Sequence, residues 1–234
     1  MIQNDPTCPL GGFAGTFAQA DVAIEVRRGF ADDEIPSDAS GFDGAIVLGG
    51  AMGANDAARF PWLSDVHHLI RDAANERVPL LGICLGMQLA AVALGGEVTR
   101  NPNGRAAGLV PVDAAPGTDP LLGGLAPASA IQWNDDIVSR LPDGSSLLTT
   151  SPDGTPQAIR FGPLAWGVQY HPEATAAIFR SWLDEEAAAG AVADTAAGTT
   201  AWQAVAAAGG RLLVLAEAVA GRFLDLCRAA RAAA

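Results

Sequence analysis

Short apolar runs and helix-like repeats alternate along the first hundred residues. The segments 22–26 (VAIEV), 44–50 (GAIVLGG) and 79–84 (PLLGIC) have the composition of strands. Residues 62–78 carry apolar side chains at spacings of three and four, which predicts an amphipathic helix. Residues 85–94 form an Ala/Leu-rich run that two glycines end, and they predict a second helix. This alternation of strand and helix predicts an α/β domain with a mainly parallel sheet.

The pattern changes beyond residue 97, where the apolar runs become shorter and closer together. We expect these runs to extend the sheet with antiparallel strands or to build a small side layer. They are LVPVDA (109–114), AIQW (130–133), SLLTT (146–150), QAIRF (157–161) and LAWGVQY (164–170).

The last sixty residues combine two predicted helices with a segment of small residues. Residues 175–189 predict a helix, and 187–200 (AAAGAVADTAAGTT) has the composition of a linker. A further helix is predicted over about 202–230, with an apolar stripe that must pack on a partner surface, preferably of the same chain. We therefore divide the chain into a domain over 1–189 and a linker with a C-terminal amphipathic helix over 190–234. The stripe consists of Leu212, Leu215, Val219, Phe223 and Leu226.

Composition excludes several classes of partner and chemistry. The formal net charge of the 234 residues is −12, which argues against nucleic acid or an anionic membrane as partner. All 14 basic residues are arginine, and this excludes lysine Schiff-base chemistry and a lysine-containing phosphate loop. The apolar C-terminal run is too short and too charged to span a bilayer, and no secretory signal pattern is visible. We expect a cytoplasmic protein.

The three cysteines have neither the number nor the spacing of a disulfide framework or a metal site. Cys8, Cys84 and Cys227 form no close pair, so we expect them to be reduced and no metal to be bound. Cys84 stands between glycines in Gly82-Ile83-Cys84-Leu85-Gly86, at the junction of a predicted strand and a predicted helix. Small residues on both sides permit the sharp turn of a nucleophile elbow. The following helix directs its free N–H groups at the sulfur and favours the thiolate.

A thiolate that acts on an amide needs an acid for the departing nitrogen, and histidine is the usual one. His67 and His68 lie within the predicted helix 62–78, and we interpret both as structural. His171 ends the predicted strand LAWGVQY. In an open α/β sheet the carboxyl ends of strands form the sites, so His171 can meet Cys84 there.

Glu173, two residues after His171, is placed to hold the imidazole as the third member of a triad. Each residue alone also has a structural interpretation: Cys84 as a small core residue, His171 as a rim residue, and Glu173 as a carboxylate at a helix start. Their combination favours catalysis.

These motifs resemble those of a known family. Gly-x-Cys-x-Gly-x-Gln over residues 82–88, followed by His-Pro-Glu over 171–173, is similar to class I (triad) glutamine amidotransferases. The nearest resemblance is to free-standing members related to the amidotransferase domain of GMP synthase, and it covers about residues 3–189. It implies a flavodoxin-like fold: a mainly parallel central sheet flanked by helices, here with a C-terminal helical extension.

The resemblance also implies residue roles. Cys84 would attack the γ-amide of L-glutamine and form a γ-glutamyl thioester, with His171 as proton donor and base and Glu173 orienting it. The backbone N–H groups of Gly50 and Leu85 would form the oxyanion hole. Substrate binding would fall to Gln88 and Gly49.

Several points depart from the family pattern or stay open. Relatives often carry Trp-His-Gly-Asp where this chain has Trp133-Asn134-Asp135-Asp136. The resemblance implies no cofactor, and an ammonia-accepting synthetase as a separate partner of a monomer or homodimer. The alternatives are a γ-glutamyl hydrolase acting on γ-glutamyl amines or peptides and, less favoured, a non-catalytic binding module.

Overall fold

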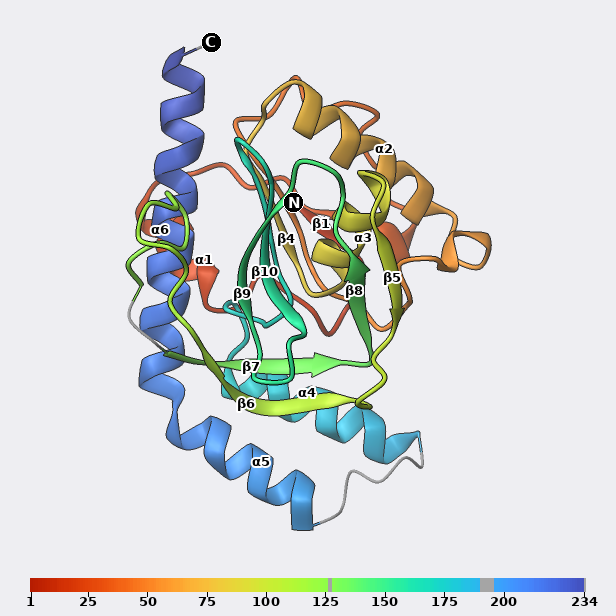
Figure 1. The fold of residues 1–234 in the computed structure, drawn as a ribbon, viewed down its shortest axis with the longest axis vertical. Helices are drawn as coiled ribbons and strands as arrows, with labels where there is room; N and C mark the ends of the chain where they lie inside the picture. The colour runs from red at the N-terminus through yellow and green to blue at the C-terminus, as the bar shows by residue number, and fades with distance from the viewer. Residues whose placement is uncertain (126–127, 190–195, 234) are drawn as a thin grey trace.

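The computed structural model describes residues 1–125, 128–189 and 196–233, and a seven-stranded sheet lies at its centre (Figure 1). The strands follow the order β2-β1-β3-β4-β11-β10-β9. Strand β11 returns beside β4, so the carboxyl ends of these two strands meet at one edge of the sheet. The strands are β1 (Ile2–Gln3), β2 (Arg27–Arg28), β3 (Ala45–Val47), β4 (Leu80–Ile83), β9 (Ser146–Thr150), β10 (Pro156–Gly162) and β11 (Ala165–Val168).

The sheet is parallel over five strands and antiparallel at one end. Strands β2, β1, β3, β4 and β11 pair in parallel, whereas β10 pairs antiparallel with β11 and with β9. The mainly parallel α/β sheet predicted from the sequence is therefore confirmed, and β9 and β10 form its antiparallel extension. The run 164–170, expected in that extension or in a side layer, instead forms β11, which pairs parallel with β4. Strand β4 is buried along its whole length, as a central parallel strand with both faces covered must be.

Helices cover both faces of the sheet. Helices α2 (Trp62–Asn75) and α3 (Leu85–Ala93) pack into one apolar cluster with β3 and β4. Helix α1 (Phe13–Gln19) and the long α6 (Gly209–Ala233) build a second cluster on the other face. The two short 3₁₀ turns are η1 (Gly29–Ala31) and η2 (Asp56–Ala58).

Two antiparallel ribbons lie outside the central sheet, and one of them, β6–β7, corresponds to apolar runs predicted from the sequence. Strands β5 (Glu97–Arg100) and β8 (Asp136–Arg140) make one ribbon, and β6 (Ala106–Val112) and β7 (Ala128–Asn134) make the other. Helices α4 (Ala176–Ala188) and α5 (Ala196–Ala207) lie beneath the second ribbon in Figure 1. Helix α4 also contacts the carboxyl end of the central sheet, because Trp182 packs on His171 and donates to the Thr7 carbonyl.

The strand predicted over 22–26 is wrong. Val22 and Ile24 are 37% and 38% exposed, and the chain joins the sheet only at β2. There the Arg27 N–H donates to the Met1 carbonyl at 2.9 Å, in register with β1. Apolar alternation alone did not make this segment a strand, because the ladder with β1 begins only at Arg27.

The C-terminal prediction is corrected in two places. Part of the linker predicted over 187–200, residues 190–195, lies outside the described residues, and the rest belongs to α4 and α5. The helix predicted over 202–230 is two helices, bent by 65° beside Ala208. Two consecutive glycines follow Ala208, and each is about 1 kcal/mol less favourable than alanine inside a helix. The bend lets α5 reach β6 while α6 runs along α1.

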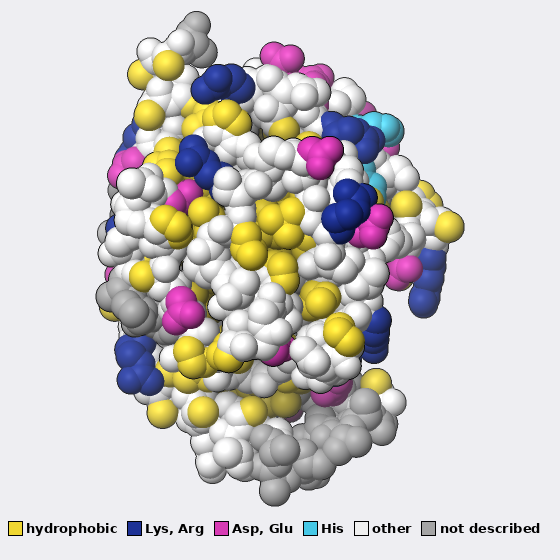
Figure 2. Space-filling view, viewed as in Figure 1, with side chains coloured by type: hydrophobic (Ala, Val, Ile, Leu, Met, Phe, Trp, Pro, Cys, Tyr) yellow, Lys and Arg dark blue, Asp and Glu magenta, His cyan; other side chains and the backbone are white. Residues whose placement is uncertain are grey.

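The apolar stripe of α6 packs on its own chain, as expected. Leu215, Val219 and Phe223 are buried against α1 and the sheet, while Leu212 packs with α4 and α5. No single helix in the described ranges is long and apolar enough to cross a membrane; α5 and α6 together reach that length and composition, across their bend. On the face shown in Figure 2, acidic and basic side chains are interspersed around apolar ones.

Candidate active site

Cys84 stands at the sharp turn between β4 and α3. Its φ of 52° and ψ of −106° are unusual for a residue with a side chain and store about 1–3 kcal/mol of strain. The Cys84 N–H donates to the Val168 carbonyl at 2.8 Å, and its own carbonyl accepts from the Gln88 N–H at 3.1 Å. The strained turn is therefore held from the neighbouring strand β11 and from the first turn of α3.

The glycines around Cys84 are required by close packing. A Cβ on Gly82 would lie 2.5 Å from the Gly86 carbonyl, and a Cβ on Gly86 would lie 2.0 Å from the Val47 carbonyl. The first turn of α3 thus rests directly on β3 and β4. This is the physical basis of the Gly-x-Cys-x-Gly pattern: side chains at either glycine would push the helix away and misdirect its N-terminus.

The Cys84 sulfur has two polar neighbours. Its thiol lies 3.8 Å from the Trp133 carbonyl oxygen, and the Gln169 amide donates to the sulfur at 3.5 Å. Gln169 is fully buried on the connection that leads from β11 to His171. The donor amide and the positive end of α3 both favour negative charge on the sulfur.

His171 and Glu173 form a buried pair. The His171 Nδ1 and Glu173 Oε1 atoms are 2.8 Å apart, and the two side chains are 2% and 1% exposed. Burial lowers the pKa of His171, but the charges of Glu173 and Cys84 and hydrogen bonds to both outweigh it, so that this pKa rises to about 10. These interactions favour the protonated imidazole.

The backbone around this pair is tightly fixed. The His171 N–H donates to the Ile131 carbonyl at 2.7 Å, which ties it to β7. The Gly12 N–H donates to the Glu173 carbonyl at 2.7 Å, and a Cβ on Gly11 would lie only 2.1 Å from that oxygen. Gly11 also has a φ of 55°, so this approach to Glu173 needs glycine there.

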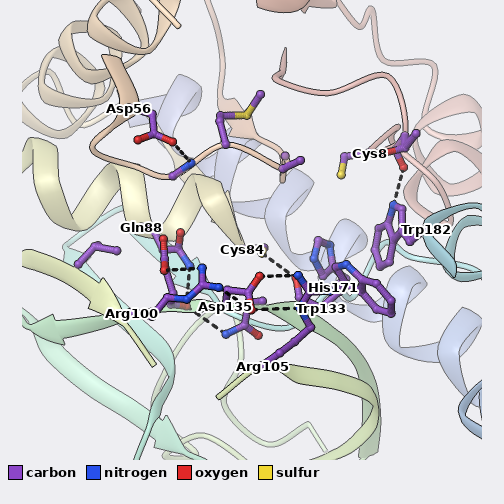
Figure 3. A pocket seen from close by; sticks show the side chains of 18 of the residues that line it. Cys8, Asp56, Cys84, Gln88, Arg100, Arg105, Trp133, Asp135, His171 and Trp182 are labelled. Atoms are coloured by element: carbon purple, nitrogen blue, oxygen red, sulfur yellow. Dashed lines mark hydrogen bonds and ion pairs between the residues drawn. The ribbon is translucent and has the colours of Figure 1, made fainter. Parts of the chain in front are cut away.

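Cys84 and His171 line one cavity of about 660 Å³ (Figure 3). His171, Trp182 and Cys8 lie toward one side of the view, and Asp56, Gln88 and Arg100 toward the other. Polar and charged side chains line most of the wall. The lining includes Thr7, Cys8, Gly50, Met52, Asn55, Asp56, Cys84, Gln88, Thr99, Arg100, Arg105, Trp133, Asn134, Asp135, Asp136, His171, Trp182, Glu185 and Glu186.

The remaining residues predicted for the site lie around Cys84. Gly50 lines the cavity, and a Cβ on it would lie 3.1 Å from the Leu85 side chain, so the two are close neighbours. Leu85 begins α3, and its N–H is among those that a helix leaves unpaired. Gly49 is not part of the cavity wall: it packs against His171, whose Cε1 would be 2.9 Å from an added Cβ. Its proposed contact with substrate stays a prediction.

Gln88 is held from both sides. Its Nε2 donates to the Asp136 carbonyl at 2.9 Å and to Gln169 Oε1 at 3.2 Å. Gln88 therefore joins α3 to the start of β8 and to the segment that carries His171. Its amide oxygen lacks a partner among these hydrogen bonds, which leaves it available to a ligand in the cavity.

The segment Trp133–Asp136, where the family pattern differs, is clamped by Arg105. The guanidinium donates to both carboxylate oxygens of Asp135, at 3.0 and 2.6 Å, and also pairs with Glu186 of α4. The hydrogen bond from Arg105 holds the pKa of Asp135 below its ordinary value. Asn134 is buried, and its Nδ2 donates to the Asp136 carbonyl at 3.1 Å.

Sequence reasoning missed several of these neighbours. Gln169 lies within the predicted strand LAWGVQY, but nothing local indicated that its amide reaches Cys84. Trp182 packs against His171 with ring centroids 4.7 Å apart. His67 and His68 do not line the cavity, and His68 is exposed. Within the described ranges, no three His, Cys, Asp or Glu side chains are grouped to hold a metal ion.

Comparison with known proteins assigns the chain to a family. The family model described as "Glutamine amidotransferase class-I" matches residues 14–186. A glutamine-hydrolysing GMP synthase subunit of Natronomonas pharaonis is 36% identical over 145 residues, which are 61% of this chain and 72% of the relative. The corresponding protein of Haloarcula marismortui is 35% identical over 159 residues, 67% of this chain and 76% of the relative.

Solved structures agree in fold. The crystal structure of a glutamine amido transferase from Methylobacillus flagellatus superposes with a TM-score of 0.83 at 29% identity, covering 96% of this chain and 93% of that one. A glutamine amidotransferase from Thermotoga maritima has the same TM-score at 23% identity, which shows the shared fold. The flavodoxin-like arrangement expected from the resemblance is confirmed, and the chain belongs to the class I glutamine amidotransferase family.

Proposed function

We propose that this protein hydrolyses the γ-amide of L-glutamine through Cys84, His171 and Glu173, and that it delivers the ammonia to a separate acceptor enzyme. The Cys84 thiolate attacks the γ-carbon of glutamine, and the amide oxygen becomes an oxyanion. The N–H groups of Gly50, which follows β3, and Leu85, which begins α3, stabilise that oxyanion.

His171 then transfers its proton to the departing nitrogen, so that ammonia leaves and a γ-glutamyl thioester with Cys84 remains. The neutral imidazole next takes a proton from water, which attacks the thioester and releases glutamate. Glu173 acts throughout by orienting the ring through Nδ1 and stabilising the imidazolium. Gln88 is proposed to hold the amino-acid end of the substrate.

One observation carries this proposal: His171, buried and 2.8 Å from Glu173, lines the same cavity as Cys84 at the N-terminus of α3. A buried imidazole and carboxylate without a catalytic task would be a costly pair to keep, since each charge loses its water. The raised pKa of His171 supplies the acid that the first step needs.

The test is glutamine turnover combined with covalent labelling. The purified chain should release ammonia and glutamate from L-glutamine, and a glutamine-like diazo ketone should label Cys84 in the peptide 78–100. Cys84→Ser should lose both, while Cys227→Ser, a matched change at a buried cysteine outside the cavity, should keep both. An unlabelled Cys84 in an otherwise folded protein would instead favour a non-catalytic binding module.

The cavity volume favours a second candidate, a γ-glutamyl hydrolase. About 660 Å³ lies within the range of pockets that hold drug-sized ligands, and exceeds what one amino acid needs. The same chemistry then releases an amine or peptide in place of ammonia. Turnover of a panel of γ-glutamyl amines and peptides beside glutamine separates the two activities, because a glutaminase should prefer glutamine in kcat/KM.

The acceptor enzyme is proposed from the relatives, which are named as subunits of a glutamine-hydrolysing synthase. The charged side chains of Asp56 and Arg100 are exposed at the cavity, where a partner would dock to receive ammonia. Copurification of a synthetase that raises glutamine turnover would support this assignment. A cytoplasmic location is proposed with it, since the three free cysteines suit a reducing compartment.

A further inference from the structure

A second cysteine lies in the candidate active site, and the proposed mechanism does not use it. Cys8 follows β1 in a turn whose Cys8 N–H donates to the Asp5 carbonyl at 3.1 Å. The side chain is 7% exposed and lines the same cavity as Cys84. The two cysteines are 76 positions apart in sequence, so only the fold brings them together.

The space between the two side chains is kept open by a glycine. A Cβ added to Gly49 would lie 3.5 Å from Cys8 Sγ, 3.7 Å from Cys84 Cβ and 2.9 Å from His171 Cε1. Both cysteines thus border the same point, and no side chain from Gly49 fills it. The Cys8 sulfur and the Cys84 side chain therefore flank one shared space, across which a bond between the two sulfurs would form.

The turn that carries Cys8 is fixed to the catalytic side of the cavity. The Trp182 Nε1–H donates to the Thr7 carbonyl at 2.9 Å, and the Trp182 ring packs on His171. Because Thr7 precedes Cys8 in the chain, this hydrogen bond holds Cys8 beside His171. Figure 3 shows Cys8 and Trp182 on the same side of the cavity, with the hydrogen bond of Trp182 drawn beside Cys8.

The third cysteine provides a contrast. Cys227 on α6 packs against Gly44, where a Cβ would lie 2.4 Å from its sulfur. Gly44 precedes β3, whereas Gly49 follows it, so Cys227 lies at the opposite end of that strand from the other two. It is a buried thiol that does not line the cavity.

We propose that Cys8 is a resolving thiol, which converts an oxidised Cys84 into a reversible Cys8–Cys84 disulfide. A hydroperoxide takes the electron pair of the Cys84 thiolate, transfers one oxygen and is reduced to its alcohol or to water, leaving a sulfenic acid at Cys84. The Cys8 sulfur then attacks the Cys84 sulfur, and the sulfenic hydroxyl leaves as water with the proton of the Cys8 thiol.

The disulfide occupies the nucleophile and stops turnover, and a dithiol restores both thiols. It also protects Cys84 from the sulfinic acid, which dithiols do not reduce. Burial raises the pKa of the Cys8 thiol, so Cys8 stays protonated and does not compete with Cys84 for substrate in the reduced enzyme. The effect on turnover rests on the proposed function, whereas formation of the bond does not.

The bond is read directly by mass spectrometry of the full chain. The protein is treated with hydrogen peroxide, remaining thiols are alkylated, and the chain is digested with trypsin. Cleavage after arginine separates the three cysteines into peptides 1–27, 78–100 and 223–228. We expect peptide 1–27 joined to peptide 78–100, with loss of two hydrogen atoms. Absence of this joined pair, or pairing of either with 223–228, overturns the proposal.

Matched variants test the consequence, each scaled to its own activity before oxidation. Wild type and Cys227→Ser should recover glutamine turnover with dithiothreitol, and Cys8→Ser should not recover, its Cys84 being found as sulfinic acid. Recovery of Cys8→Ser equal to wild type would overturn the proposal. A joined peptide pair in a chain without glutaminase activity would refute the proposed function alone, and glutaminase activity without the joined pair would refute the resolving thiol alone.

Discussion

The carboxylate of Glu173 is expected to set the pH range in which His171 can act as an acid. Two unit charges about 4 Å apart attract each other by about 4 kcal/mol at an effective dielectric constant of 20. One pKa unit corresponds to about 1.4 kcal/mol, so this attraction amounts to about three units. The net rise of the His171 pKa from 6.5 to about 10 is of similar size: burial lowers this pKa, and the charges of Glu173 and Cys84 together with hydrogen bonds to both raise it.

Glu173→Gln removes the charge and keeps the shape of the side chain. We expect the alkaline limb of kcat/KM to move from near pH 10 toward neutrality by about two to three pH units. Glutamine turnover of this variant is measured as ammonia released between about pH 6 and pH 11. Turnover at neutral pH should also fall, but less in Glu173→Ala than in His171→Ala, because orienting the ring contributes less than transferring the proton.

The matched control is Glu185→Gln, which removes a carboxylate from the cavity wall but leaves the His171 pair intact. Its alkaline limb should stay in place. If the alkaline limb of kcat/KM did not move in Glu173→Gln, the proposed effect of the Glu173 charge on the His171 pKa would be refuted, even if activity fell. Stability gives a second readout: a raised folded-state pKa of His171 stabilises the protein fully below about pH 6.5, and this contribution is lost as the pH rises through about 10.

Other predictions concern the turn and the C-terminal helices. Cys84→Ala should abolish turnover with the fold intact, and Cys84→Gly, which relieves the positive φ, should be more stable than Cys84→Ala by about 1 kcal/mol in urea unfolding. Phe223→Ala, 3% exposed, should cost about 3–5 kcal/mol, against less than about 0.5 for Leu213→Ala, 49% exposed on the same helix; equal costs would contradict the packing of α6. Truncation after residue 189 should lower the melting temperature or cause aggregation, because it uncovers α1; an unchanged melting temperature and oligomeric state would show that these helices serve only a partner.

Local patterns sufficed for the elements that meet at Cys84. The apolar run of β4, the glycines on either side of Cys84 and the apolar repeat of α3 lie within about fifteen residues, so strand, turn and helix could be predicted together. The stripe on α6 was predictable for the same reason, since a helix places residues three and four apart on one face. The local pattern was wrong for residues 22–26, because whether a segment forms a strand depends on pairing with a strand that is distant in sequence.

The catalytic proposal itself needed one step beyond local pattern. Cys84 and His171 were brought together by the general behaviour of parallel sheets, in which strand ends collect at one edge. The parallel pairing of β4 with β11 is the observed basis of that expectation. The His171–Glu173 contact could be predicted because only Pro172 stands between the two residues, although the burial of the pair could not.

Composition and local spacing by themselves determined the α/β class, the elbow at Cys84 and the candidate His-x-Glu pair. Only the tertiary structure decided which side chains surround the sulfur. Gln169 donates to it from 85 positions away, and Cys8 approaches it because Trp182 holds the turn after β1 against His171. Contacts of this kind leave no periodic trace in the chain, because they depend on how separate elements pack and not on the repeat of any one of them.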